Sequence, residues 1–168
     1  MNKKKNTQKF IRVEGMDYEK DETFGGFMSA ATLLLTTKLN LPPSCGMEEI
    51  SEKLNQISDP EILHLVGAIM CVGDIPYPEI YINDRKNHYC LYSPEEFEEI
   101  REDLYWISDK LRDLCEDFGL IFKEFFLQEN EILYNDGYQI VISKKTYDRH
   151  NKEAKYEPLD YSLIEEGD

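Results

Sequence analysis

PEEFEEIREDLYWISDKLRDLCEDF, residues 94–118, repeats apolar side chains at alternating spacings of three and four. This is the period of one face of an amphipathic helix. Ser93 precedes the stretch as an N-cap, Pro94 takes the first helical position and Glu96 supplies a capping-box carboxylate. We therefore expect one helix over residues 94–118, about 37 Å long at about 1.5 Å per residue. Its apolar row, which we expect to lie in the core, is Phe97, Ile100, Leu104, Ile107, Leu111, Leu114 and Phe118.

The opposite face of this helix is acidic. Like charges four residues apart destabilise a helix by a few tenths of a kcal/mol per pair, so the acidic row works against its own helix. Such a local conflict is typical of a functional surface, and we interpret the row as an interface for a basic partner, anchored by the only tryptophan. The alternative is a solvated charged face. The predicted interface comprises Glu95, Glu98, Glu99, Glu102, Tyr105, Trp106, Asp109, Asp113 and Glu116.

N-terminal to the long helix, the apolar pattern predicts a short strand at 10–13, followed by helices. A helix is expected over 23–39, capped by Thr23, and a shorter one over 44–54. Asp59-Pro60-Glu61 is a strong start signal for a third helix that extends to about Val72. Because this third helix is nearly all apolar, we expect it at the centre of the core.

Around and after the long helix, short runs rich in β-branched and aromatic residues predict strands. They cover 79–82, 88–92 and 120–127, and the pair 131–135 and 138–143 flanks Asp136-Gly137, the strongest hairpin signal in the chain. The fold class expected is α+β, in which N-terminal helices pack with a short, hairpin-built antiparallel sheet and one long amphipathic helix. We expect residues 1–8 to be a disordered basic tail, 9–146 a single domain and 147–168 a polar, loosely ordered tail.

Charge is the property in which this sequence is most unusual. The chain has 34 acidic and 19 basic residues, a net charge of −15. Residues 1–12 carry five bases and no acid, so the rest of the chain carries −20. A surface this negative repels nucleic acid and anionic membranes and attracts basic proteins. We therefore expect no direct nucleic-acid binding, no membrane association and no cofactor, although solubility alone is a common reason for such a charge.

The cysteines predict reduced thiols in a cytosol, because they form no closely spaced pair and no secretory signal precedes them. They are Cys45, Cys71, Cys90 and Cys115. On the predicted elements, His64 shares a face with Cys71 and His88 shares a face with Cys90. With Cys45 these four are weak zinc candidates, because structural zinc sites usually use closely spaced ligand pairs and only His88 and Cys90 resemble one. We predict no metal.

The leading hypothesis is a non-enzymatic module that binds a basic protein surface. One version is an inhibitor that mimics nucleic acid in the binding site of a nuclease or another nucleic-acid-binding protein. Phage or mobile-element antagonists, acting in the host cytosol, and immunity proteins belong to this class. One alternative is a small cytosolic hydrolase or transferase with a cleft near His64, His88 and Cys90, and another is a structural or assembly protein. The sequence favours the first only through its charge, and it does not identify the oligomeric state.

Overall fold

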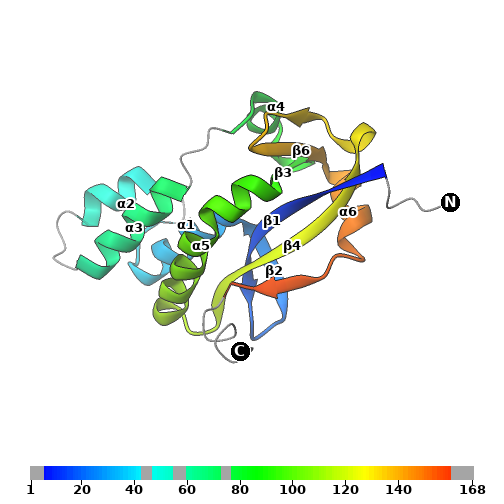
Figure 1. Cartoon of the computed structure of the whole chain (residues 1–168). Coiled ribbons are helices and arrows are strands. Elements are labelled where there is room, and N and C mark those ends of the chain that lie inside the picture. Colours follow the sequence, from blue (N-terminus) through cyan, green and yellow to red (C-terminus); the bar gives the residue numbers. More distant parts are fainter. Residues whose placement is uncertain (1–5, 43–46, 55–59, 73–76, 160–168) are drawn as a thin grey trace. The chain divides into compact units, whose positions relative to one another are not determined.

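The computed structural model describes residues 6–42, 47–54, 60–72 and 77–159 of the chain, and its fold is α+β (Figure 1). Seven strands form an antiparallel sheet with the order β5-β6-β3-β1-β4-β7, and β2 pairs with β1 beside this path. The strands are β1 (Thr7–Asp17), β2 (Glu22–Gly26), β3 (His88–Tyr92), β4 (Phe118–Gln128), β5 (Tyr134–Asn135), β6 (Gln139–Ser143) and β7 (Tyr156–Pro158). The helices are α1 (Phe27–Lys38), α2 (Met47–Leu54), α3 (Pro60–Val72), α4 (Glu79–Asn83), α5 (Pro94–Leu114) and α6 (Lys144–Asn151).

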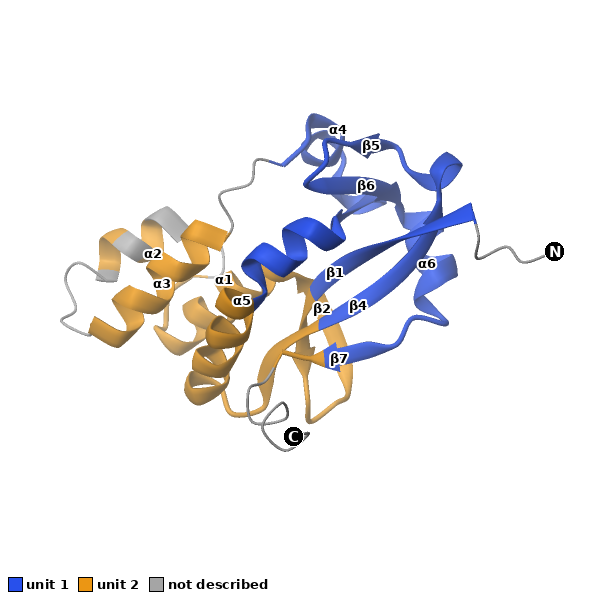
Figure 2. Ribbon diagram, viewed as in Figure 1, with its two compact units in different colours: residues 1–13, 76–101, 122–157 blue, residues 14–75, 102–121, 158–168 orange. Residues whose placement is uncertain are grey.

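The chain divides into two compact units, shown in Figure 2. Unit 1 consists of residues 1–13, 76–101 and 122–157, and unit 2 of residues 14–75, 102–121 and 158–168. Each unit is thus assembled from three separate stretches of sequence. The single domain expected over 9–146 stays a prediction.

Unit 1 has a hydrophobic core between strands and α6. The β3–β6 ladder runs from His88 opposite Ser143 to Tyr92 opposite Gln139, and β1 joins it where Ile11 faces Tyr92. This ladder places alternate side chains on one face, where they are withdrawn from water. The core residues are Phe10, Leu91, Phe125, Leu127, Ile140, Ile142 and Tyr147.

Unit 2 has its own buried side chains on three helices. Leu34 and Leu35 of α1, Ile69 of α3, and Leu104 and Leu111 of α5 are all buried. The α5 residues belong to the apolar row predicted from sequence. The prediction that this row lies in the core is confirmed for four members, since Phe97, Leu104, Ile107 and Leu111 are buried, whereas Ile100, Leu114 and Phe118 are half-buried. The predicted start of α5 is also confirmed, since Ser93 caps the helix through its Oγ, which accepts from the Glu96 N–H at 3.2 Å.

The beginning of the chain differs from the sequence expectation. The short strand expected at 10–13 is the 11-residue β1, so the fold opens on a strand of the main sheet rather than on helices, and the sheet is larger than the short sheet that was expected. The helix expected from Thr23 begins at Phe27 instead, because residues 22–26 pair with β1 as β2. Gly25 has a φ of +60°, a left-handed conformation that cannot belong to a right-handed helix.

The stretch 79–82, predicted as a strand, is the short helix α4. Pro78 stands at its N-cap, and the Pro78 carbonyl accepts from the N–H groups of both Tyr81 and Ile82. The rings of Tyr77 and Tyr81 lie 5.0 Å apart, and the guanidinium of Arg85 lies 5.8 and 5.5 Å from them. Tyr81 lies within α4, and Tyr77 and Arg85 flank the helix on its two sides. The aromatic and β-branched composition of 79–82 gave no sign of this short helix.

The stretch after Thr146, expected to be loosely ordered, contains regular structure. Residues 144–151 form α6, whose N-cap Ser143 accepts from the Thr146 N–H at 3.1 Å. Residues 156–158 form β7, and in unit 2 the buried Leu159 donates its N–H to the Leu120 carbonyl at 2.9 Å. Strand pairing and capping therefore hold this part of the chain although its composition is polar.

Candidate protein-binding surface

The acidic face of α5 is exposed along most of its length. In unit 1, Glu95, Glu98 and Glu99 are exposed, and Glu98 pairs with Arg101 at 3.3 Å. In unit 2, Glu102 and Asp113 are exposed and Asp109 is half-buried. An ion pair at the surface contributes little to stability, so pairing within the protein does not prevent an exposed carboxylate from contacting another charged molecule.

Two members of the predicted interface are placed differently from the expectation. Tyr105 was placed on or beside the outer acidic face, but it is only 5% exposed. The buried face of α5 is wider than its apolar row, since Ser108 is also buried and its Oγ accepts from the Leu120 N–H at 3.0 Å. Glu116 is exposed but follows the last helical residue, Leu114, in the turn before β4. Glu116 is therefore not an acid in the last turn of the helix.

Trp106 is half-buried because α3 covers part of its ring. The rings of Trp106 and His64 lie 4.8 Å apart between centroids, at an interplanar angle of 39°. Lys110, one turn further along α5, places its ammonium 5.8 Å from the centre of the Trp106 ring. A partly covered tryptophan beside exposed acids is suited to a contact with another protein, because one face of the ring is already held in place.

The neighbouring helix α3 presents an exposed face without charge. It was expected at the centre of the core, and its side chains Leu65, Val66, Ile69 and Val72 are indeed buried. The opposite side is exposed, however, with Leu63 at 38% and Met70 at 39%. The exposed sector comprises Pro60, Leu63, His64, Gly67, Met70 and Cys71, and the exposed Glu61 lies beside it in the first turn. A helix that is apolar all round looks like a core helix in sequence, so the pattern gave no signal of this exposed side.

Most of the negative charge of the described residues belongs to unit 2. The described residues of unit 2 include 15 acids and five bases, a net charge of −10. Those of unit 1 include 13 acids and 11 bases, a net charge of −2. The separation is invisible along the sequence because each unit draws on three stretches of chain. A field of one sign over one unit steers an oppositely charged partner toward that unit.

The four weak zinc candidates fall into separate units. His64 and Cys71 belong to α3 in unit 2, whereas His88 and Cys90 belong to β3 in unit 1. Nδ1 of His88 lies 2.8 Å from the Asp84 carbonyl oxygen. Within the described ranges, no three His, Cys, Asp or Glu side chains converge as a ligand set, and Cys45 lies outside those ranges.

Cys90 lacks the setting of a nucleophile. Burial raises the pKa of its thiol to about 11, although the guanidinium groups of Arg12 and Arg85 act in the opposite direction. Arg12 also donates to the Cys90 carbonyl at 2.9 Å. A thiol with this pKa is protonated at neutral pH, and the reactive species of cysteine is the thiolate.

Alkylation provides a direct measurement of this difference between the cysteines. Iodoacetamide at pH 8 is expected to modify the exposed Cys71 at least about tenfold faster than Cys90, because the thiolate fraction of Cys90 is small. Peptide mapping by mass spectrometry over time gives both rates, and in urea they should become similar. Equal rates in the folded protein would contradict the buried, protonated Cys90 and would support the enzyme alternative.

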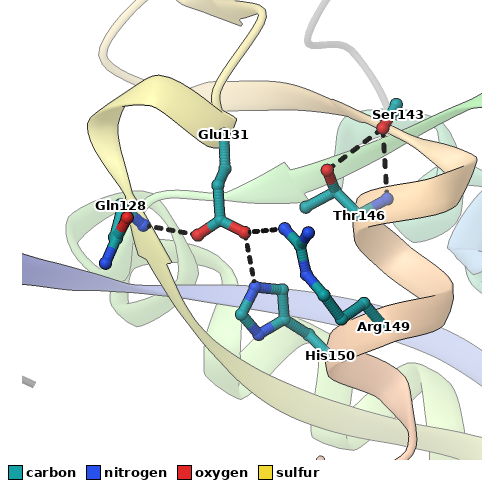
Figure 3. Close-up of polar contacts among 6 residues, drawn as sticks. All are labelled: Gln128, Glu131, Ser143, Thr146, Arg149 and His150. Carbon is teal, nitrogen blue, oxygen red and sulfur yellow. Dashed lines mark hydrogen bonds and ion pairs between the residues drawn. The ribbon is translucent and has the colours of Figure 1, made fainter. Parts of the chain in front are cut away.

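A second polar cluster, in unit 1, joins the turn at 129–131 to α6 (Figure 3). The Glu131 carboxylate accepts from the Gln128 N–H at 2.9 Å, lies 2.8 Å from His150 Nε2 and forms an ion pair with Arg149. Burial opposes ionisation of Glu131, but these donors together lower its pKa. The sequence did not indicate this cluster, because Glu131 and His150 are far apart in the chain. Its geometry holds α6 against the turn at 129–131.

None of the helices in the described parts of the chain is both long enough and apolar enough to cross a membrane. Comparison with protein-family models, with curated proteins and with solved structures finds no match to this chain.

Proposed function

We propose that the protein is a non-enzymatic binding module that uses the acidic surface of unit 2 to recognise a basic surface on another protein. The observation that carries the proposal is the separation of charge, −10 on the described residues of unit 2 against −2 on those of unit 1. A need for solubility alone gives no reason to concentrate the charge in one unit. Complementary charge across an interface speeds association and selects the partner.

The most concrete form of this function is inhibition of a protein that binds nucleic acid. A site that binds phosphates is rich in Lys and Arg, and a surface with exposed carboxylates competes for the same cations. Three exposed acids are suited to this competition. Two lie in the unit 2 part of α5 and one in the turn that follows it: Glu102, Asp113 and Glu116. An antagonist encoded by a phage or mobile element, or an immunity protein, would act in this way.

Charge reversal at these three positions tests the proposal. The partner is first captured from a bacterial lysate in 50 mM salt, identified, and purified for titration. The triple variant Glu102→Lys, Asp113→Lys and Glu116→Lys is expected to bind it at least about 100-fold more weakly, because attractive pairs become repulsive. Competition by duplex DNA for the same partner shows whether the captured site is one for nucleic acid.

A charge-matched control separates a defined surface from net charge. The variant Glu129→Lys, Glu153→Lys and Glu157→Lys makes the same change in net charge at exposed positions of unit 1. It is expected to retain the affinity of the unaltered protein within a few-fold, and circular dichroism should be unchanged for both variants. The proposal would be refuted if both variants lost affinity for the partner equally, or if the variant with reversed charges in unit 2 still bound it.

A further inference from the structure

We propose that the exposed face of α3 is a docking site for the apolar side of a basic amphipathic helix of the partner. This inference rests on the proposed function and adds the kind of structural element that is recognised. It is carried by the shape of the α3 face, by the absence of charge on it and by the acids beside it.

The shape of the face suits another helix. Leu63, Gly67 and Met70 are spaced four and three residues apart, so they form a single row along α3. A Cβ placed on Gly67 would meet no heavy atom within 4 Å apart from its chain neighbours and the backbone of its own helix, so the glycine leaves a gap between two exposed apolar side chains. Helices pack by inserting the side chains of one into the grooves of the other, and this gap is a place for one such side chain.

The chemistry of the face is unusual for an exposed surface of this protein. Charged residues make up 32% of the chain, yet Glu61 is the single charged residue of α3. The six residues of the exposed sector carry no formal charge with His64 neutral. Exposed apolar patches rimmed by polar residues mark sites of protein contact. Methionine at such a site adapts to different partners because its side chain is flexible and polarisable.

Charge complementarity identifies the occupant as basic. Trp106 contacts His64 at the edge of the α3 sector, and Glu102 and Asp109 lie about one helical turn on either side of Trp106. A helix with an apolar stripe on the α3 row directs its flanking Lys and Arg side chains toward these acids. Basic helices of this kind are also the elements with which many proteins read DNA, which agrees with the proposed inhibition.

The test uses a defined probe, an 18-residue helical peptide of lysine and leucine with one leucine face. A scrambled peptide of the same composition has the same charge but no apolar face. We expect the amphipathic peptide to bind at least tenfold more tightly than the scrambled one in 200 mM salt, measured by fluorescence anisotropy. Emission from Trp106, the only tryptophan, should change on binding of the amphipathic peptide.

Gly67→Gln is the informative variant. The open space at Gly67 accommodates the new side chain, and glutamine is a better helix former than glycine, so the fold should be retained or stabilised. The variant fills the gap, and we expect at least tenfold weaker binding of the amphipathic peptide with no change for the scrambled one. Leu133→Gln alters a leucine of unit 1 that is 50% exposed, and this control should leave both affinities unchanged.

The outcomes separate this inference from the proposed function. Equal binding of both peptides, with Gly67→Gln without effect, would overturn the helix site and leave recognition by charge intact. Absence of binding by either peptide in 50 mM salt would overturn both. A concentration-dependent dimer in sedimentation that Gly67→Gln abolishes would also overturn the inference, because the face would then bind a second copy of the chain.

Discussion

Replacing Gly15 by alanine is expected to lower the free energy of unfolding by about 2–3 kcal/mol, the effect of overpacking a core. A Cβ at Gly15 would lie 2.7 Å from the Ala30 Cβ and 2.7 Å from Cζ of Phe24. Ala30 is completely buried on α1 and has no rotatable side chain that can move away. Gly15 also adjoins the irregularity in the β1–β2 register.

The sign of this effect is decided by contacts rather than by backbone entropy. At a position with room, Gly→Ala stabilises a protein by about 0.4–1 kcal/mol, because the unfolded chain loses conformations. Gly67→Ala is the matched control, since its Cβ meets nothing within 4 Å and it lies within α3. We expect Tm to fall by about 4–10 °C for Gly15→Ala and to rise by a few degrees for Gly67→Ala. Thermal unfolding in which both variants shift in the same direction would contradict this account of Gly15.

The second large effect is a loss of stability at alkaline pH. Burial raises the pKa of Cys90 to about 11 and that of Tyr77 to about 12, and it also raises the pKa of Tyr92. Above about pH 9 the unfolded chain loses protons from these groups while the folded protein keeps them. Stability is therefore fully present below the ordinary pKa values and decreases as the pH rises toward the raised ones. We expect a loss of about 2–3 kcal/mol between pH 8 and pH 11, with partial solvent access included.

Urea unfolding at several pH values measures this effect. The double variant Tyr77→Phe and Cys90→Ala removes two of the three groups, and its stability should decrease with pH by about a third as much above pH 9. Comparing the slopes of the two proteins, rather than their stabilities at one pH, cancels the contribution of other ionising groups. Identical slopes would show that these buried groups are not the source of the alkaline sensitivity.

The parts of the fold that were predictable from sequence have strong local signals. The cap, proline and acidic first turn fixed the start of α5 at Pro94, and Asp136-Gly137 correctly marked the turn before β6. The end of α5 was extended too far, because the apolar spacing continues through Phe118 into β4. The spacing of apolar residues cannot show where the helix ends and the strand begins, because Phe118 fits both the helical and the strand pattern.

The parts that were not predictable depend on contacts between distant residues. β2 contains Phe24-Gly25-Gly26 and has no alternating pattern, and it is a strand because β1 pairs with it. Leucine occurs on both the exposed and the buried face of α3, and neither face carries an acid or a lysine or arginine, so charge patterning does not distinguish them. The candidate site was predictable to the extent that it depends on the charges of α5. The positions of Tyr105 and Trp106 depend on neighbours that the sequence does not identify.

The assembly of each unit from three stretches of sequence has a consequence for biosynthesis. Phe10 and Phe125 belong to one core cluster, so the core of unit 1 cannot close on the ribosome until the third stretch has left the exit tunnel. Until then, the apolar residues of β1 stay unburied while most of the chain is synthesised, and they can aggregate or bind chaperones. No single cut of the gene yields either unit alone, so the acidic unit must be studied in the whole chain.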